Sequence, residues 1–134
     1  MILGDLGANV IKVENPGHGD ETRTFGPPFK SGESAYYLAA NRNKKSLLCD
    51  LKSKEGQDVL KKLASKSDIL IENFRFGQME KFGLGLEYLR QSNPKLITCS
   101  ISGYGRDSPL AERAGYDFMI QAESGLMSIN GQPE

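Results

Sequence analysis

"ILIENFRFGQMEKFGLG", residues 69–85, contains the clearest strand signal of the chain and shows how that strand ends. The apolar run 69–71 is typical of a buried β-strand. It stops at Glu72, Asn73 and Phe74, and glycines typical of turns follow shortly afterwards. A strand with such an end either enters a simple turn or borders a ligand site.

The same strand pattern recurs along the chain, separated by helical patterns. Strands are predicted near residues 9–14, 45–50, 68–73 and 96–102. Helices are predicted at the tail 1–6 closed by Gly7, at 35–41, at 53–64 with Ser53 as its N-cap, in short pieces within 79–89, and at 118–127. Residues 15–33 are predicted to be loop, and no hairpin signal separates the strands. This alternation predicts an α/β, Rossmann-like fold with an open, mostly parallel sheet and helices on both faces.

Composition limits the classes of function. The 134 residues suffice for one compact domain, with 38% hydrophobic and 25% charged residues. Seventeen basic residues balance seventeen acidic ones, so there is no electrostatic signature of nucleic-acid binding or of an anionic membrane partner. No apolar run approaches the roughly 20 residues that span a bilayer. Asp5 interrupts the apolar start, which argues against a signal peptide.

The sequence also argues against several kinds of site. His18 is the single histidine, and Cys49 and Cys99 are the only cysteines, so no zinc site of usual spacing is predicted. Both cysteines lie in strand-like apolar segments and are predicted to be buried, reduced thiols. The nucleophile elbow of serine hydrolases, the dinucleotide fingerprint and the P-loop are all missing from the sequence.

Several ordered stretches together resemble one family. They are "LGDLGANVIKVENPGHGDETR" (3–23), "NRNKKSLLCDLKSKEG" (41–56), "DILIENFRFG" (68–77), "GLGLEYLRQSNPKLITCSISGYG" (83–105) and "RAGYDFMIQAESGLMSINGQP" (113–133). In order and spacing they resemble the class III CoA-transferases, over essentially the whole chain.

The resemblance implies a function and an assembly. Family members transfer coenzyme A between carboxylic acids, here from succinyl-CoA to a dicarboxylate such as glutarate. An aspartate attacks the thioester to form a mixed anhydride, and the freed CoA thiolate then forms an enzyme-bound thioester. Coenzyme A and acyl-CoA are thus substrates, and no permanently bound cofactor or metal is expected. The implied partner is a second copy of the protein in an interlocked homodimer, with no nucleic acid and no membrane.

The resemblance also implies the residues that contact coenzyme A. They are Asn73, Phe74, Arg75, Lys81, Lys52, Tyr116, Asp117 and Asn15. The Asn73 amide would form hydrogen bonds, and the Phe74 ring would pack on the nucleotide. Lys81 stands where the family often has arginine, so a point charge replaces a bidentate donor. Asn15 stands where some members carry arginine.

Each of these residues also has an ordinary structural interpretation. Asn73 is equally typical of a turn, and Phe74 of a core ring. The cations are typical of a solvated surface. Tyr116 and Asp117 are typical of the entry to a helix. From the residues alone, these interpretations stay open.

The resemblance further implies that residues 1–134 are a partial large, CoA-binding domain. The first strand, the segment with the nucleophilic aspartate, the small domain and the C-terminal segment are expected to lie outside this chain. No catalytic residue is therefore assigned within it, and the chain alone is expected to be inactive. The implied location is the mitochondrial matrix if the members acting on succinyl-CoA and glutarate are the guide, and otherwise the cytoplasm.

Two alternatives remain at this point. An α-methylacyl-CoA racemase shares the fold but carries histidine where this chain has Tyr116, and tyrosine, with a pKa of about 10, is a poor base near neutral pH. The other alternative is a CoA-binding or dimerisation module without chemistry of its own.

Overall fold

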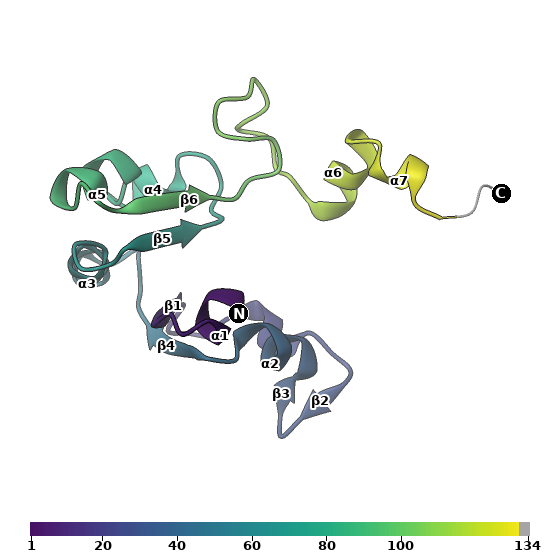
Figure 1. The fold of residues 1–134 in the computed structure, drawn as a ribbon, viewed down its shortest axis with the longest axis horizontal. Helices are drawn as coiled ribbons and strands as arrows, with labels where there is room; N and C mark the ends of the chain where they lie inside the picture. The colour runs from purple at the N-terminus through teal and green to yellow at the C-terminus, as the bar shows by residue number, and fades with distance from the viewer. Residues whose placement is uncertain (132–134) are drawn as a thin grey trace. The chain divides into compact units, whose positions relative to one another are not determined.

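The computed structural model describes residues 1–131. It divides into two compact units, an N-terminal unit, Met1–Val59, and a C-terminal unit, Leu60–Glu134. The division falls within the helix α3, Lys54–Ala64. Each unit has its own arrangement of strands and helices, and each is described by itself (Figure 1).

The N-terminal unit is built on one pair of parallel strands. β1, Val10–Glu14, pairs in parallel with β4, Lys44–Leu48, in the register Val10 to Lys44. A short helix α1, Ile2–Asp5, precedes β1, and Gly7 then adopts the left-handed conformation (φ 96°) that closes it. The predicted N-terminal helix tail and both predicted strands are confirmed.

The crossover between β1 and β4 contains α2, Ala35–Asn41, at the predicted residues. The hydroxyl of Ser34 caps it by accepting hydrogen bonds from the amides of Tyr36 and Tyr37. A helix between two parallel strands is the expected way to return the chain to the same end of a sheet.

The segment predicted as loop contains more structure than its sequence suggested. A 3₁₀ turn, Glu21–Thr24, is followed by a hairpin of β2, Phe29–Lys30, and β3, Glu33–Ser34. Ser31 and Gly32 both have positive φ, 52° and 85°, as the tightest hairpin turns require. The prediction of loop throughout residues 15–33 was therefore wrong in part, and the Ser31-Gly32 pair is the turn signal that could have found the hairpin.

The helix α3 begins as predicted. The Ser53 hydroxyl accepts a hydrogen bond from the amide of Gly56 at 3.0 Å, and Glu55 lies in the first turn. Lys54 and Asp58 form an ion pair one turn apart at 3.3 Å. Gly56 is buried, and a Cβ there would lie 1.9 Å from the carbonyl oxygen of Asp50, so only glycine fits this position without a shift.

The C-terminal unit contains the second parallel pair. β5, Ile69–Glu72, and β6, Ile97–Ser100, run parallel in the register Ile69 to Ile97. Between them lie α4, Gln78–Lys81, and α5, Leu86–Ser92, as the sequence predicted (Figure 1). The predicted parallel orientation of the strands is thus confirmed in both units.

The two faces of the β5–β6 pair differ. Thr98 lies toward α5, where it accepts a hydrogen bond from Arg90. On the alternate face, Ile71 and Ile97 are 54% and 62% exposed, and Cys99 is exposed as well. Among the described residues of the C-terminal unit, helices cover one face of this pair and leave the other exposed. For the same reason the prediction of a buried Cys99 was wrong, whereas Cys49 is buried.

The core of the C-terminal unit lies under the helices. Its buried apolar side chains are Ala64, Met79, Leu84, Leu89 and Leu96. Asn93, after α5, donates hydrogen bonds to the carbonyls of Ala64 and Ser67 at 3.0 and 2.8 Å. This side chain satisfies carbonyls near the end of α3 that no longer have a partner within the helix.

The last predicted helix is broken in two. α6, Asp117–Glu123, and α7, Leu126–Ile129, are separated at Gly125, which has φ 78°. The left-handed conformation ends the first helix, as glycine commonly does. Within each unit, the described long strands form one parallel pair, β1 with β4 and β5 with β6. No helix within residues 1–131 has the length and apolar character needed to cross a membrane.

Candidate functional site

The loop after β5 carries the densest group of predicted site residues. Asn73, Phe74 and Arg75 leave the carboxyl end of the strand in succession, and all three are exposed. In open α/β sheets, ligands bind beyond the carboxyl ends of the strands. The loop thus presents an amide, an aromatic ring and a guanidinium at the edge where such ligands bind.

Two local features give this loop its shape. The carboxylate of Glu72 accepts a hydrogen bond from the amide of Phe74 at 2.8 Å, which turns the chain just after the strand. The amide of Gln78 then bonds to the carbonyl of Arg75 at 3.0 Å, with Gly77 at φ 73°. Gly77 supplies the left-handed residue that a side chain would make costly. The turn leads directly into α4.

Phe74 is held from one side by another ring. Its centroid lies 5.8 Å from that of Phe82, with the planes at 83°, and the Phe74 side chain remains 39% exposed. Edge-to-face contacts of this kind are favourable. Phe74 is therefore oriented by its neighbour without being buried, and part of the residue stays accessible to a ligand.

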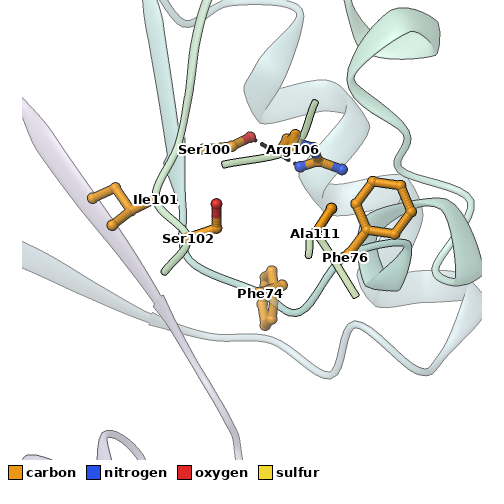
Figure 2. Close-up of a pocket in the computed structure, with 7 residues that line it drawn as sticks. All are labelled: Phe74, Phe76, Ser100, Ile101, Ser102, Arg106 and Ala111. Carbon is orange, nitrogen blue, oxygen red and sulfur yellow. Dashed lines mark hydrogen bonds between the residues drawn. The ribbon is translucent and has the colours of Figure 1, made fainter. Parts of the chain in front are cut away.

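Phe74 also lines a shallow depression at the ends of β5 and β6, shown in Figure 2. Its lining residues are Phe74, Phe76, Ser100, Ile101, Ser102, Arg106 and Ala111. The Ser100 hydroxyl accepts a hydrogen bond from Arg106 at 3.0 Å. Asn73 and Arg75 do not line this depression.

Lys81 lies in the last turn of α4 and is exposed. Its side chain is therefore accessible to solvent, and its contact with a phosphate stays a prediction. The helix that carries it begins at the turn formed by Asn73–Gly77, so Lys81 and the strand-end loop belong to one continuous segment.

Tyr116 and Asp117 lie at the start of α6 in the same unit. Tyr116 precedes the helix and is 67% exposed. The Asp117 carboxylate accepts a hydrogen bond from Gln121 at 2.6 Å. Both positions thus serve as the entry to a helix, which was the ordinary interpretation of their sequence, and both remain accessible.

A close backbone contact brings this segment to the end of β6. A Cβ at Gly103 would lie 2.7 Å from the Cα of Gly115 and 2.8 Å from Ile120, and a Cβ at Gly115 would meet Gly103 in the same way. The two glycines allow the loop after β6 to pass against the residue before Tyr116. Sequence reasoning missed this pair, because nothing local links positions 103 and 115.

Asn15 and Lys52 belong to the N-terminal unit. Asn15 follows the carboxyl end of β1, and its side-chain oxygen accepts a hydrogen bond from the amide of Gly17 at 2.8 Å. Lys52 is exposed in the turn between β4 and α3, and its amide donates to the Asp50 carboxylate at 2.9 Å. Each residue thus follows the carboxyl end of its own strand.

Sequence reasoning also missed the charged residues beside these loops. Glu14 and Glu72 are buried at the ends of β1 and β5, and arginines reach them from later loops. For Glu14, burial opposes ionisation, but hydrogen bonds from Arg23, Ser46 and the Asp20 amide outweigh it and hold the pKa below its ordinary value. Among the described residues, no group of three or more potential ligands is placed to hold a metal ion.

Comparison with known proteins identifies relatives over the full chain. Succinyl-CoA:glutarate CoA-transferase of Homo sapiens is 52% identical over 131 residues, which cover 98% of this chain and 30% of the relative. Succinate–glutarate CoA-transferase of Agrobacterium fabrum is 50% identical over 140 residues, covering 100% of this chain and 35% of the relative. The chain thus spans about a third of the length of these curated relatives.

Solved structures agree with the fold. A CAIB/BAIF family protein from Brucella suis matches with a TM-score of 0.91 at 50% identity, over 98% of this chain and 36% of that protein. A hypothetical protein from Mycobacterium tuberculosis matches with a TM-score of 0.86 at 41% identity, over 99% and 36%. The profile of CoA-transferase family III covers residues 1–134, so the chain belongs to CoA-transferase family III.

Proposed function

We propose that this chain contributes CoA-binding elements to an enzyme that transfers coenzyme A between carboxylic acids. The observation that carries the proposal is the exposed Asn73-Phe74-Arg75 loop at the carboxyl end of β5, in a chain of this family. Its groups match what coenzyme A offers: polar atoms for an amide, an adenine face for a ring, and phosphates for a cation.

We propose that succinyl-CoA is the donor and a dicarboxylate such as glutarate the acceptor. The names of the human and Agrobacterium relatives, at 52% and 50% identity, support this choice. Other relatives act on different acids: an acetyl-CoA:oxalate CoA-transferase of Acetobacter aceti is 44% identical. The acceptor is therefore the finer part of the proposal, and the transfer of coenzyme A is the broader part.

In the proposed reaction an aspartate of the full-length protein attacks the carbonyl carbon of the thioester. The carbon–sulfur bond breaks, and an acyl-aspartyl anhydride and the CoA thiolate form. The thiolate next attacks the aspartyl carbonyl, which releases the donor acid and leaves an aspartyl-CoA thioester. The acceptor carboxylate then attacks that thioester by the same two steps in reverse.

We propose that the nucleophilic aspartate, the small domain and the remaining strands lie outside residues 1–134, which would then be a partial large domain. Coverage of about a third of the relatives supports this assignment. Asp117, at the N-terminal end of the seven-residue α6, is assigned to binding and not to attack. An interlocked homodimer and a mitochondrial-matrix location are part of the same proposal and rest on the family resemblance.

The binding experiment measures the Kd of the full-length protein for coenzyme A by titration calorimetry. Asn73→Ala and Phe74→Ala are each expected to weaken binding about tenfold, as lost specific contacts commonly do. Asn9→Ala is the matched control, because Asn9 is also exposed but precedes the amino end of β1. Equal affinity in all of these variants would contradict the assigned site.

The chemical experiment incubates the protein with succinyl-CoA and glutarate. Glutaryl-CoA is expected as product, and hydroxylamine is expected to trap the acyl-enzyme as a hydroxamate. Binding of coenzyme A without transfer by the full-length protein would favour a binding module without chemistry. Exchange of the α-proton of a 2-methylacyl-CoA would favour the racemase, for which Tyr116 is a poorly suited base.

A further inference from the structure

Both parallel strand pairs have a buried glutamate at a strand end, followed by an exposed asparagine. β1 ends in Val13-Glu14 followed by Asn15, and β5 ends in Ile71-Glu72 followed by Asn73. Glu14 and Glu72 are 4% and 7% exposed, whereas the asparagine after each is exposed. Successive side chains of an extended chain point to opposite faces. A buried glutamate is therefore followed by an exposed asparagine at both strand ends.

The Glu72 carboxylate joins the strand end to two other segments. One oxygen accepts the amide of Phe74 at 2.8 Å, and the other accepts Arg106 at 2.9 Å. Arg106 comes from the loop after β6, and its guanidinium lies over the ring of Phe76, 5.7 Å from the centroid. Figure 2 shows this guanidinium between Ser100 and Phe76.

Arg106 has two further hydrogen-bond partners. It bonds to the Ser100 hydroxyl at 3.0 Å and to the Glu80 carboxylate of α4 at 3.3 Å. One guanidinium thus connects the ends of β5 and β6 with α4. Since two carboxylates already neutralise it, Arg106 is poorly suited to bind a phosphate itself.

The Glu14 carboxylate is held in a similar way in the N-terminal unit. Arg23, from the 3₁₀ turn after β1, donates to its two oxygens at 3.2 and 3.3 Å. The Ser46 hydroxyl of β4 donates at 2.8 Å, and the Asp20 amide donates at 2.9 Å. The Arg23 guanidinium lies 4.0 Å from the centroid of the Tyr37 ring.

The shared elements are a buried glutamate at a strand end, an arginine from a later loop, an aromatic ring beside that arginine, and a backbone amide of the following loop. A buried carboxylate is strongly unfavourable unless it is paired and hydrogen-bonded. The loop amide and the arginine are therefore fixed to the carboxylate, and the loop that follows the strand acquires one conformation.

We infer that the pairs Glu72–Arg106 and Glu14–Arg23, the strand-end ion pairs, are positioning residues for coenzyme A. They act through the residues that follow each glutamate, holding Asn73 and Phe74 in one loop and Asn15 in the other. This inference rests on the proposed function, because it takes coenzyme A as the ligand that each loop contacts.

The test uses the full-length protein and the variants Arg106→Gln and Arg106→Lys. Arg106→Gln is expected to raise KM for succinyl-CoA about tenfold or more, since displacements near 1 Å cost up to about 100-fold, with a smaller change in kcat. Arg106→Lys keeps the charge and is expected to restore part of the loss. Arg90→Gln is the control, because Arg90 pairs with Glu87 on the surface of α5 at 3.2 Å.

A second measurement separates positioning from stability. Hydrogen exchange at the Phe74 amide is expected to be faster in Glu72→Ala and Arg106→Gln than in the wild type or in Arg90→Gln. A purely structural role would lower the amount of active protein and leave KM unchanged. If Arg106→Gln does not fold, Arg23→Lys and Arg23→Gln test the second ion pair by the same KM measurement.

The outcomes distinguish the two proposals. A wild-type protein that does not bind coenzyme A overturns the proposed function and this inference with it. A wild-type protein that binds coenzyme A, together with unchanged KM in the arginine variants of both ion pairs, overturns this inference alone.

Discussion

At the scale of single residues, Asp20 contributes to how the stability of the N-terminal unit depends on acid pH. Its burial favours the neutral form, but the Lys12 ion pair and hydrogen bonds from the Thr22 hydroxyl and amide outweigh that effect, so the pKa falls from 3.8 to about 2. The ionised carboxylate therefore stabilises the fold above about pH 3.8, and this contribution is lost as the pH falls toward about 2.

We therefore predict that the Tm of the protein depends on acid pH and that Asp20→Asn makes this dependence weaker. The Tm of the protein should fall between about pH 4 and about pH 2, and Asp20→Asn should flatten the profile in that window. Thermal unfolding followed by circular dichroism at a series of pH values measures this. Asp107→Asn, in an exposed loop, removes the same charge as a control. Parallel profiles for wild type and Asp20→Asn would contradict the assignment.

A second prediction at this scale concerns Lys81. Lys81→Ala should weaken coenzyme A binding severalfold at low salt, and the difference should shrink at high salt, because ions screen an exposed charge. Lys95→Ala is the matched control, since Lys95 is exposed just before the amino end of β6. A salt-independent loss would mean that Lys81 acts through packing, and no loss would remove it from the site.

At the scale of elements, the start of α3 shows how one glycine permits a turn. Ser53 caps the helix, while the chain from β4 passes so close that a Cβ at Gly56 would reach the Asp50 carbonyl. Alanine normally stabilises a helix interior by about 1 kcal/mol relative to glycine. Here the added Cβ would contact a backbone carbonyl, and no change of side-chain rotamer can relieve that contact. Glycine is therefore more favourable than alanine at position 56.

We therefore expect Gly56→Ala to lower the free energy of unfolding by about 3 kcal/mol. Gly85→Ala is the control: Gly85 has φ −52°, and a Cβ there would meet only the Glu80 side chain at 3.5 Å. Its cost should stay below about 1 kcal/mol. Urea unfolding measures the free energy of unfolding of both variants. Equal midpoints for the two variants would contradict the prediction and would mean that the Asp50 backbone shifts to accommodate the added Cβ.

At the scale of the whole molecule, the uncovered strand face is the main feature. Ile69, Ile71 and Ile97 lie on one face of the β5–β6 pair at 45%, 54% and 62% exposure. Apolar side chains gathered on an exposed strand face favour association with another apolar surface. In the proposed full-length enzyme, further parts of the large domain or the partner subunit would cover this face.

The prediction is that residues 1–134 alone self-associate. Light scattering and dye binding should show aggregation, and the double substitution Ile71→Thr with Ile97→Thr should reduce both while keeping β-branched side chains in the strands. Val59→Thr, with Val59 40% exposed on α3, is the control. A monodisperse wild-type monomer with a cooperative unfolding transition would contradict this expectation.

The sequence alone determined most of the local structure. The four long strands, the helix at Ala35–Asn41 and the Ser53 cap lie where the sequence predicts them, because periodicity and capping act over three or four residues. The parallel orientation also followed from the alternation of strands and helices. The eight candidate residues are all exposed, and their contacts with coenzyme A stay predictions.

The tertiary structure decided what depends on distant contacts. Glu72 and Arg106 are 34 positions apart, and only the pairing of β5 with β6 brings the guanidinium to the carboxylate. Gly103 meets Gly115, and Cys99 is exposed because no described helix of the C-terminal unit covers its face of the strand pair. The local sequence pattern predicts whether a residue lies in a strand or a helix and which face of that element it is on. It does not predict what packs against that face, because packing depends on residues distant in the sequence.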